Sequence, residues 1–214
     1  TWVSISELQP STVYAFISAE DARFFEHEGV DVIRIAGAIV ADIKAGSYVQ
    51  GASTISQQLI KLSHLTSEKT ISRKAEEAAL AYEMERQYSK EDILEMYLNY
   101  VYFGRGAYGV EAAAQAYFDC SAAELTAAQA ATLAAIIKAP SAYSPQQNPE
   151  SNAKRRNYIL ATMRDNNLLS QEEYALAAAE AIAVIPQKAA ETRYGWYLDA
   201  VLDEAGSVLG VSGD

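Results

Sequence analysis

The chain has 214 residues, of which 50% are hydrophobic, and its formal net charge at pH 7 is −11. This composition predicts a folded protein with a substantial core. The acidic balance argues against a general nucleic-acid-binding protein, because such a protein presents a basic surface to phosphates. A single cysteine, Cys120, excludes an internal disulfide and a cysteine-based zinc site. No apolar run reaches the roughly 18 residues that a membrane span needs, since Asp31, Arg34 and Asp42 interrupt the best candidate, 30–43.

The first predicted element is an apolar segment, 13–17, that leads into an acidic pair, Glu20 and Asp21. Partial burial at the end of a half-buried helix would raise the pKa of Glu20 and suit it to acid–base chemistry near neutral pH. The alternative is an ordinary surface carboxylate close to a helix terminus. We expect Asp21 to close the following turn towards Arg23 or His27, and His27 to be a packed, hydrogen-bonded histidine.

Segment 51–61 is a loop of small and hydroxyl-bearing residues that opens into a helix. Ser53 and Thr54 lie at the helix start, while Gln58 and Lys61 are three residues apart and therefore face the same way. With the backbone amides of a helix N-terminus, these groups would attract an anion such as a phosphate. The alternative is a plain helix cap with exposed polar residues. Because the glycine spacing of a Walker loop is missing, nucleotide binding is disfavoured.

A helix that begins near Arg73 places a second carboxylate, Glu77, on its apolar stripe. A charged residue on a buried face needs a partner or a function, and Arg73 and Lys74 lie one turn earlier, where they can pair with it. The pair can be purely structural, or the cations can hold a phosphate beside Glu77. Lys61 and Lys69 would strengthen this local positive field. The other acids of the helix are expected to form its solvated face: Glu76, Glu83 and Glu85.

Capping signals predict the helices of the second half of the chain. The capping-box pairs are Ser89 with Asp92, Thr126 with Gln129, and Ser170 with Glu173. A glycine-rich loop, 104–109, joins two helices and lets backbone approach a ligand or another helix closely. The helix capped by Thr126 should stop before Pro140, and a further helix should start at 148–149. The helix capped by Ser170 should end near Pro186. Apart from a short strand at 183–185, no β element is predicted, so the fold class is mainly α.

Five motifs then follow one another within residues 13–145. They are Glu20-Asp21-x-x-Phe24-x-x-His27-x-Gly29, Gly51-x-Ser53-Thr54-x-x-Gln57-Gln58-x-x-Lys61, Arg73-Lys74-x-x-Glu77, Ile93-Leu94-Glu95-x-Tyr97-Leu98-Asn99-x-x-Tyr102-x-Gly104-x-Gly106-x-Tyr108-Gly109-Val110, and Ala130-x-x-Leu133-Ala134 with Lys138-Ala139-Pro140 and Tyr143-Ser144-Pro145. In this order they resemble the signatures of the bacterial peptidoglycan glycosyltransferases, the family-51 domain of class A penicillin-binding proteins. Two positions depart from the family pattern: Leu62, where many relatives carry asparagine, and Asp119, where glycine is common.

The resemblance implies a helical, lysozyme-like glycosyltransferase fold with a membrane-facing jaw subdomain, formed by 30–43 and its flanks. The whole chain, 1–214, would be a single glycosyltransferase domain with a core of about 11–165. Segment 166–214 would lead toward a transpeptidase domain that is missing here. Because the sequence starts with Thr1 and not with methionine, we expect a fragment or a processed chain whose membrane anchor lies outside it.

The resemblance also implies an activity: polymerisation of lipid II into β-1,4 glycan strands with inversion and loss of undecaprenyl pyrophosphate. Glu20 would be the general base that takes the proton of the acceptor's 4-hydroxyl. Glu77 would position the donor pyrophosphate and its cations, or a divalent metal (Mg or Mn) where one is used, and no cofactor is required. The residues that would bind the phosphates and sugars are Ser53, Thr54, Gln58, Lys61, Lys69, Arg73 and Lys74.

The implied partners are lipid II, the growing glycan chain, the membrane surface and other cell-wall synthesis proteins, at the extracytoplasmic face of the bacterial plasma membrane. Two other functions stay open. One is a lysozyme-like hydrolase or lytic transglycosylase, which would use a catalytic acid but has no need of four clustered cations. The other is a non-catalytic module that binds lipid II or glycan and tolerates loss of Glu20.

Overall fold

The computed structural model describes residues 2–46, 53–64 and 70–187. Helices account for the regular structure of this part, and its only β pairing is two isolated bridges. The elements are η1 (Ile5–Glu7), α1 (Pro10–Glu20), α2 (Val32–Ala45), α3 (Ile55–His64), α4 (Ile71–Gln87), α5 (Lys90–Tyr100), α6 (Val110–Phe118), η2 (Ala122–Glu124), α7 (Ala127–Ile137), α8 (Pro149–Asp165) and α9 (Gln171–Ala179). The prediction of a mainly α fold is confirmed.

The predicted capping boxes form at the starts of α5, α7 and α9. In each, the hydroxyl of the capping residue accepts a backbone N–H and the acid or amide three residues later accepts the N–H of the cap, so two helix-end donors are satisfied. Helix α7 ends at Ile137, before Pro140, as expected. Helix α8 begins with Pro149, but the side chain of Asn148 donates to the carbonyl of Ser141 and does not cap the helix.

Two boundary predictions in the last third are wrong. Helix α9 ends at Ala179, well before Pro186. Segment 183–185 forms no strand, because no neighbouring strand pairs with it in the described part of the chain. The segment is held by a backbone hydrogen bond from Ile185 N to the carbonyl oxygen of Tyr117, at 3.0 Å.

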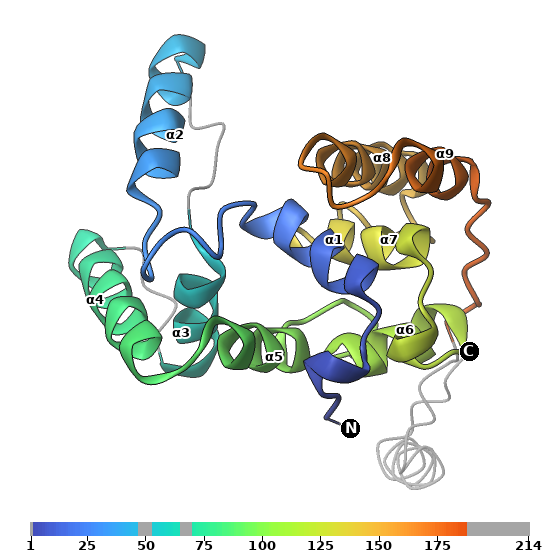
Figure 1. Ribbon diagram of the computed structural model, residues 1–214, viewed down its shortest axis with the longest axis horizontal. Coiled ribbons are helices and arrows are strands. Elements are labelled where there is room, and N and C mark those ends of the chain that lie inside the picture. The colour runs from blue at the N-terminus through green and yellow to red at the C-terminus, as the bar shows by residue number, and fades with distance from the viewer. Residues whose placement is uncertain (1, 47–52, 65–69, 188–214) are drawn as a thin grey trace, which may run out of the picture.

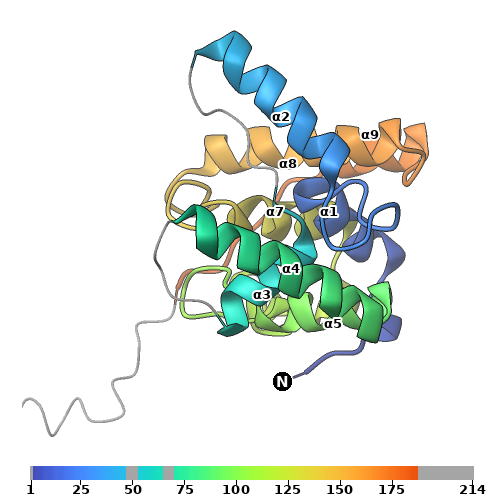
Figure 2. The same ribbon diagram turned by 90° about the vertical axis from the view of Figure 1, so that its left-hand side faces the viewer.

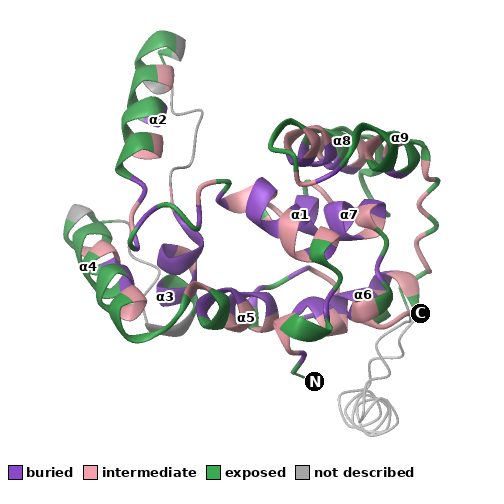
Figure 3. Ribbon diagram, in the orientation of Figure 1, coloured by how far each residue is buried: buried purple, intermediate pink, exposed green. Residues whose placement is uncertain are grey.

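The core lies around α7, which packs between α1 and α8 (Figure 1). Nearly every residue of α7 between 128 and 136 is buried, and most of them are alanines, which lets the neighbouring helices approach closely. Figure 3 shows how burial differs across the molecule: buried residues lie on α7 and on one face of α5, and exposed residues lie along α2 and the outer face of α4. The body is therefore built on the segments that follow residue 90, with α1 inserted into it.

Helix α2 projects away from this body (Figures 1 and 2). Most of its large apolar side chains are exposed, while Ile35 is partly buried; the exposed ones are Val32, Ile33, Ile39, Val40 and Ile43. No helix in the described part of the chain combines the length and the apolar character that crossing a bilayer demands.

Two glycines with positive φ hold backbone segments in close contact. A Cβ on Gly29 (φ +81°) would lie 2.6 Å from the backbone N of Tyr82 in α4, and one on Gly109 (φ +84°) would lie 2.6 Å from the carbonyl oxygen of Asn99. Only glycine fits such a conformation without strain. At Asp119, where glycine is common in the family, the backbone is also left-handed (φ 55°) because the residue ends α6. Thus the loop after α1 is tied to α4, and the loop 101–109 to α5.

Candidate active site

Glu20 ends α1 where the body meets the α2–α4 side of the molecule (Figure 1). Its side chain is 12% exposed. One carboxylate oxygen, Oε2, accepts a hydrogen bond from Gln58 Nε2 at 3.1 Å, and the other, Oε1, accepts one from Arg155 Nη2 at 3.5 Å. Burial raises the pKa of Glu20, while the Gln58 hydrogen bond and the positive charges of Arg155, Arg34 and Lys138 lower it in part. The half-buried carboxylate expected from the sequence is present.

The amide of Gln58 is oriented by Tyr97 of α5. The Tyr97 hydroxyl donates to Gln58 Oε1 at 3.1 Å, so the NH₂ group of the same amide is directed to Glu20. Burial raises the pKa of Tyr97 well above its usual range, and the charges of Glu20 and Asp21 raise it further. The tyrosine therefore stays protonated and acts as a donor.

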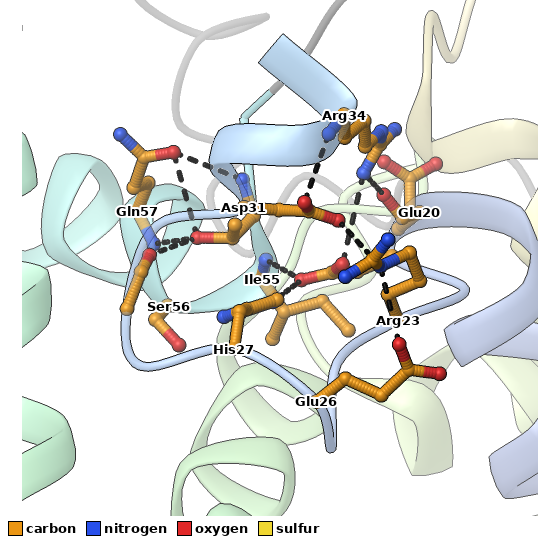
Figure 4. Close-up of polar contacts among 12 residues, drawn as sticks. Glu20, Arg23, Glu26, His27, Asp31, Arg34, Ile55, Ser56 and Gln57 are labelled. Carbon is orange, nitrogen blue, oxygen red and sulfur yellow. Dashed lines mark hydrogen bonds and ion pairs between the residues drawn. The ribbon is translucent and has the colours of Figure 1, made fainter. Parts of the chain in front are cut away.

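Asp21, the neighbour of Glu20, has a structural role that agrees with the sequence prediction. Its buried carboxylate contacts His27 Nε2 at 2.9 Å and accepts the backbone N–H of Ile55 at 3.0 Å (Figure 4). The histidine is itself buried. Arg23 pairs instead with Glu26 and Asp31, at 3.3 and 3.4 Å. The acidic loop is thus fixed to the N-terminus of α3.

Arg34, from α2, crosses above this loop (Figure 4). Its Nη1 donates to the backbone carbonyl of Glu20 and, at 3.5 Å, to that of Ser53, and lies 3.8 Å from Asp21 Oδ1. Because one guanidinium joins the end of α1 to the start of the 53–64 segment, it fixes the two predicted motifs relative to each other.

The two hydroxyl residues at the start of α3 differ in their surroundings. Thr54 is fully buried. Its hydroxyl donates to the carbonyl of Gly29 at 2.6 Å and accepts from Gln57 N at 3.1 Å, while Gln57 Oε1 accepts from Thr54 N. Thr54 therefore caps α3 and anchors the preceding loop in this structure. Ser53 is partly exposed, and its hydroxyl accepts a hydrogen bond from Lys74 Nζ at 2.8 Å.

Glu77 is buried on α4, as its place on the apolar stripe predicts, with 2% exposure. Arg73 Nη1 lies 3.3 Å from Glu77 Oε2, and Lys74 Nζ contacts Glu77 Oε1, so each oxygen of the carboxylate has its own cation. These cations come from one turn earlier on the same helix, the spacing at which helical side chains meet. The predicted pairing is confirmed.

A series of polar contacts runs from the backbone carbonyl of Glu20 to the carboxylate of Glu77. Arg34 contacts the carbonyls of Glu20 and Ser53, the hydroxyl of Ser53 contacts Lys74, and Lys74 contacts Glu77. The structure thus brings most of the predicted site residues together. Lys61 is exposed on α3. Lys69 lies outside the described residues.

The prediction for Glu85 is wrong. Its side chain is 5% exposed, and Lys90 Nζ lies 2.7 Å from its Oε2. The hydroxyl of Ser56 donates to Glu85 Oε1, and His27 Nδ1 is 3.9 Å away. Packing of α4 against α3 and the loop that follows α1 buries this position, whereas Glu76 and Glu83 are exposed as expected.

Three cations around Glu20 were missed by the sequence reasoning. Arg155 belongs to a basic run on α8, Arg34 counted only as an interruption of an apolar run, and Lys138 appeared only as part of the fifth motif. Arg34 is 14 residues from Glu20 in sequence, whereas Arg155 is 135 residues away. The one available signal was Lys138, whose motif had been recognised without a role for its charge.

The described side chains around Glu20 and Glu77 do not form a metal centre. In the portion of the chain that the structure describes, no group of three or more His, Cys, Asp or Glu side chains is arranged to hold an ion. Both oxygens of Glu77 are already in contact with cations.

Comparison with known proteins gives consistent matches. A family model described as Transglycosylase matches residues 1–164. Penicillin-binding protein 1F of Bacillus subtilis (strain 168) is 44% identical over 213 residues, which are 99% of this chain and 30% of that protein. Penicillin-binding protein 1A of Aquifex aeolicus (strain VF5) is 44% identical over 183 residues, 86% of this chain and 25% of that protein.

The fold has a counterpart among solved structures. The crystal structure of penicillin-binding protein 1A from Haemophilus influenzae superposes with a TM-score of 0.55 and 24% identity, over 98% of this chain and 22% of that chain. The chain spans less than a third of the length of these curated relatives. With the family model covering three quarters of the sequence, the chain belongs to the transglycosylase family, as the glycosyltransferase domain of a class A penicillin-binding protein.

Proposed function

We propose that this domain polymerises lipid II into β-1,4 glycan strands, with undecaprenyl pyrophosphate as the leaving group. The observation that carries the proposal is the series of contacts from the backbone carbonyl of Glu20 to Glu77, because it supports a single site that combines a carboxylate suited to proton transfer with a cluster of cations. An inverting glycosyl transfer needs both: a base for the attacking hydroxyl and positive charge for the departing phosphate.

Glu20 would act as the general base. Its carboxylate takes the proton of the acceptor's 4-hydroxyl while that oxygen forms a bond to the anomeric carbon of the donor. The bond between this carbon and the pyrophosphate oxygen breaks on the opposite face, so the configuration inverts and the electron pair leaves with the pyrophosphate. Because burial raises the pKa of Glu20, the ionised form is a stronger base than an exposed carboxylate.

The cations of α4 would stabilise the leaving group. The side chain of Lys74 is 47% exposed, so its ammonium group is accessible to a phosphate. The side chain of Arg73 is 15% exposed and more tightly held. Glu77 holds both in place. Lys61 adds an exposed charge from α3. Fixed cations act on developing charge more strongly than mobile ones do, because they need no reorganisation during the reaction.

The test is incubation of the chain with labelled lipid II in detergent, comparing wild type with Glu20→Gln. We expect glycan polymer from wild type and a loss of at least about a hundredfold in the variant, the range of a general base, while lipid II binding persists. The matched control is Glu28→Gln, an exposed acid in the neighbouring loop. Cleavage of preformed glycan would instead support the hydrolase, and binding without polymer from wild type would support the non-catalytic module.

We also propose that α2 contacts the membrane surface at the extracytoplasmic face, as the jaw of the domain. Its exposed apolar residues lie on a helix that projects from the body (Figure 2). Such a surface is suited to an acyl-chain boundary. We expect Ile39→Ser with Ile43→Ser to reduce flotation of the chain with liposomes. Leu176→Ser, an equally exposed apolar residue on α9, is the control, and equal flotation of all three proteins would contradict the assignment.

A further inference from the structure

Arg155 is a contact of Glu20 that no motif pointed to. It comes from α8, its side chain is 15% exposed, and its Nη2 lies 3.5 Å from Glu20 Oε1. Its guanidinium also lies over the ring of Tyr143, 5.4 Å from the centroid, within the range of a cation–π interaction. The cation is thus held by the body of the protein and directed to the end of α1.

The geometry differs from that of an ion pair that stabilises a fold. Strong arginine–carboxylate pairs are short and bidentate, whereas Arg155 makes one long contact, and its Nε is buried without a hydrogen-bond partner. An ionised carboxylate offers about four lone-pair directions, and the side-chain hydrogen bonds described above occupy one on each oxygen. Acceptor capacity therefore remains for the hydroxyl of a substrate.

We propose that Arg155 is a positioning residue for the base: it keeps the Glu20 carboxylate ionised in its buried site and fixes its orientation. The inference rests on the proposed function, in which Glu20 accepts a proton. Desolvation favours the neutral acid, which cannot act as a base, and a nearby positive charge opposes that tendency. Arg155 would supply this charge without taking up the proton-accepting capacity of the carboxylate.

The other groups that face Glu20 limit what Arg155 can do alone. Asp21 adjoins it on the chain, Arg34 comes from α2 and Lys138 follows α7, and both cations lower the pKa of Glu20. Gln58 of α3 and Tyr97 of α5 are neutral donors of the same network. Arg155 contacts the carboxylate itself, at Oε1. Removing Arg155 should therefore raise the pKa of Glu20, but the carboxyl should still ionise.

The first measurement needs no substrate. The carboxyl carbon of Glu20, assigned through Glu20→Gln, is followed by ¹³C NMR titration in wild type, Arg155→Gln, Arg155→Lys and Lys154→Gln. Lys154 is the adjacent, exposed cation of α8, so its loss removes the same charge on another face. We expect the pKa of Glu20 to rise in Arg155→Gln, to stay close to wild type in Lys154→Gln, and to be partly restored in Arg155→Lys. An unchanged pKa in a folded Arg155→Gln would overturn the inference.

The second measurement is polymerisation of lipid II against pH. Because the base acts when deprotonated, its rate rises with pH through the pKa of Glu20, so Arg155→Gln should move this limb to higher pH. We expect a loss of about tenfold on the limb, the scale of an opposite charge at contact distance, and less than about threefold on the plateau. A merely structural role would lower the rate equally at every pH and would overturn the inference. Absence of polymer from wild type would count against the proposed function alone, since the NMR result stands by itself.

Discussion

Glu20 and Glu77 are both carboxylates with little exposure to water, but their polar partners come from different parts of the chain. Both carboxylates are largely withdrawn from water, with side-chain exposures of 12% and 2%. Glu77 receives its cations from its own helix, one turn away. Glu20 receives its side-chain contacts from α3 and α8, 38 and 135 residues away in sequence, and Arg34 of α2 contacts its backbone carbonyl. One site is local and the other is assembled by the fold.

This difference indicates that the two carboxylates have different roles. Each oxygen of Glu77 faces a cation, so this carboxylate is suited to hold Arg73 and Lys74 in place. Glu20 has one amide donor and one long contact to an arginine, and its pKa is raised. A group that must gain and lose a proton needs such loose pairing, because tight pairing with cations would stabilise one protonation state.

The largest expected effect breaks the local site. Glu77→Gln leaves Arg73 and Lys74 without their carboxylate, and we expect the free energy of unfolding to fall by about 3 kcal/mol, the scale of a broken buried pair. Chemical denaturation measures this loss. The control is Glu76→Gln, an exposed acid on the same helix, which should change stability by less than about 0.5 kcal/mol. Equal losses in the two variants would show that Glu77 is not the anchor of this cluster.

The local site was also the part that the sequence could predict. Burial of Glu77 and its pairing with Arg73 and Lys74 follow from helical spacing, because positions three and four apart meet on a helix whatever the rest of the fold does. The helix starts at Ser89, Thr126 and Ser170 follow from capping boxes for the same reason. Side-chain patterns within one helix thus identify much of the fold and half of the site.

The assembled site could not be predicted in this way. No local pattern brings Arg155 to Glu20 across 135 residues, and the fully buried Thr54 looks identical in sequence to an exposed hydroxyl. Glu85 was expected to be solvated because its helix is rich in acids, yet tertiary packing buries it next to Lys90. Segment 183–185 has strand propensity, but no strand of the described residues pairs with it, and β-propensity depends on such context.

A second prediction sharpens the comparison through the amide of Gln58. Tyr97→Phe removes the hydroxyl that orients it, so we expect about a tenfold loss of polymerisation rate and a stability loss of about 1 kcal/mol, typical of one hydrogen bond. Tyr117→Phe is the control: its buried hydroxyl donates to the carbonyl of Phe103 at 2.8 Å, away from Glu20. It should lose similar stability with little change in rate. A rate loss in both variants would assign the effect to packing.

A third prediction concerns the pH dependence of stability at Glu20. Its pKa in the folded protein is raised by burial, so the folded state favours the protonated form. The relative stability of wild type is therefore fully present below the unfolded pKa, and it is lost as pH rises through the folded pKa. We expect Glu20→Gln, which stays neutral, to gain stability relative to wild type over that interval. Thermal unfolding of both proteins from acidic to neutral pH tests this, and a constant difference would contradict it.

The smallest expected effect lies at Ser53, which joins the two sites. Its carbonyl contacts Arg34 on the Glu20 side, and its hydroxyl contacts Lys74 on the Glu77 side. Ser53→Ala removes the hydroxyl contact and leaves the carbonyl. Because Lys74 is 47% exposed, we expect a stability loss below about 1 kcal/mol, an unchanged ionisation of Glu20 and a rate loss of a few-fold.

The control for this prediction is Ser72→Ala, at an exposed position of α4. If Ser53→Ala matched Glu77→Gln in stability or moved the pKa of Glu20, the two carboxylates would form a single coupled unit. A small effect confined to the rate would mean that Lys74 is positioned by Glu77 and that Glu20 is tuned independently by the body of the fold.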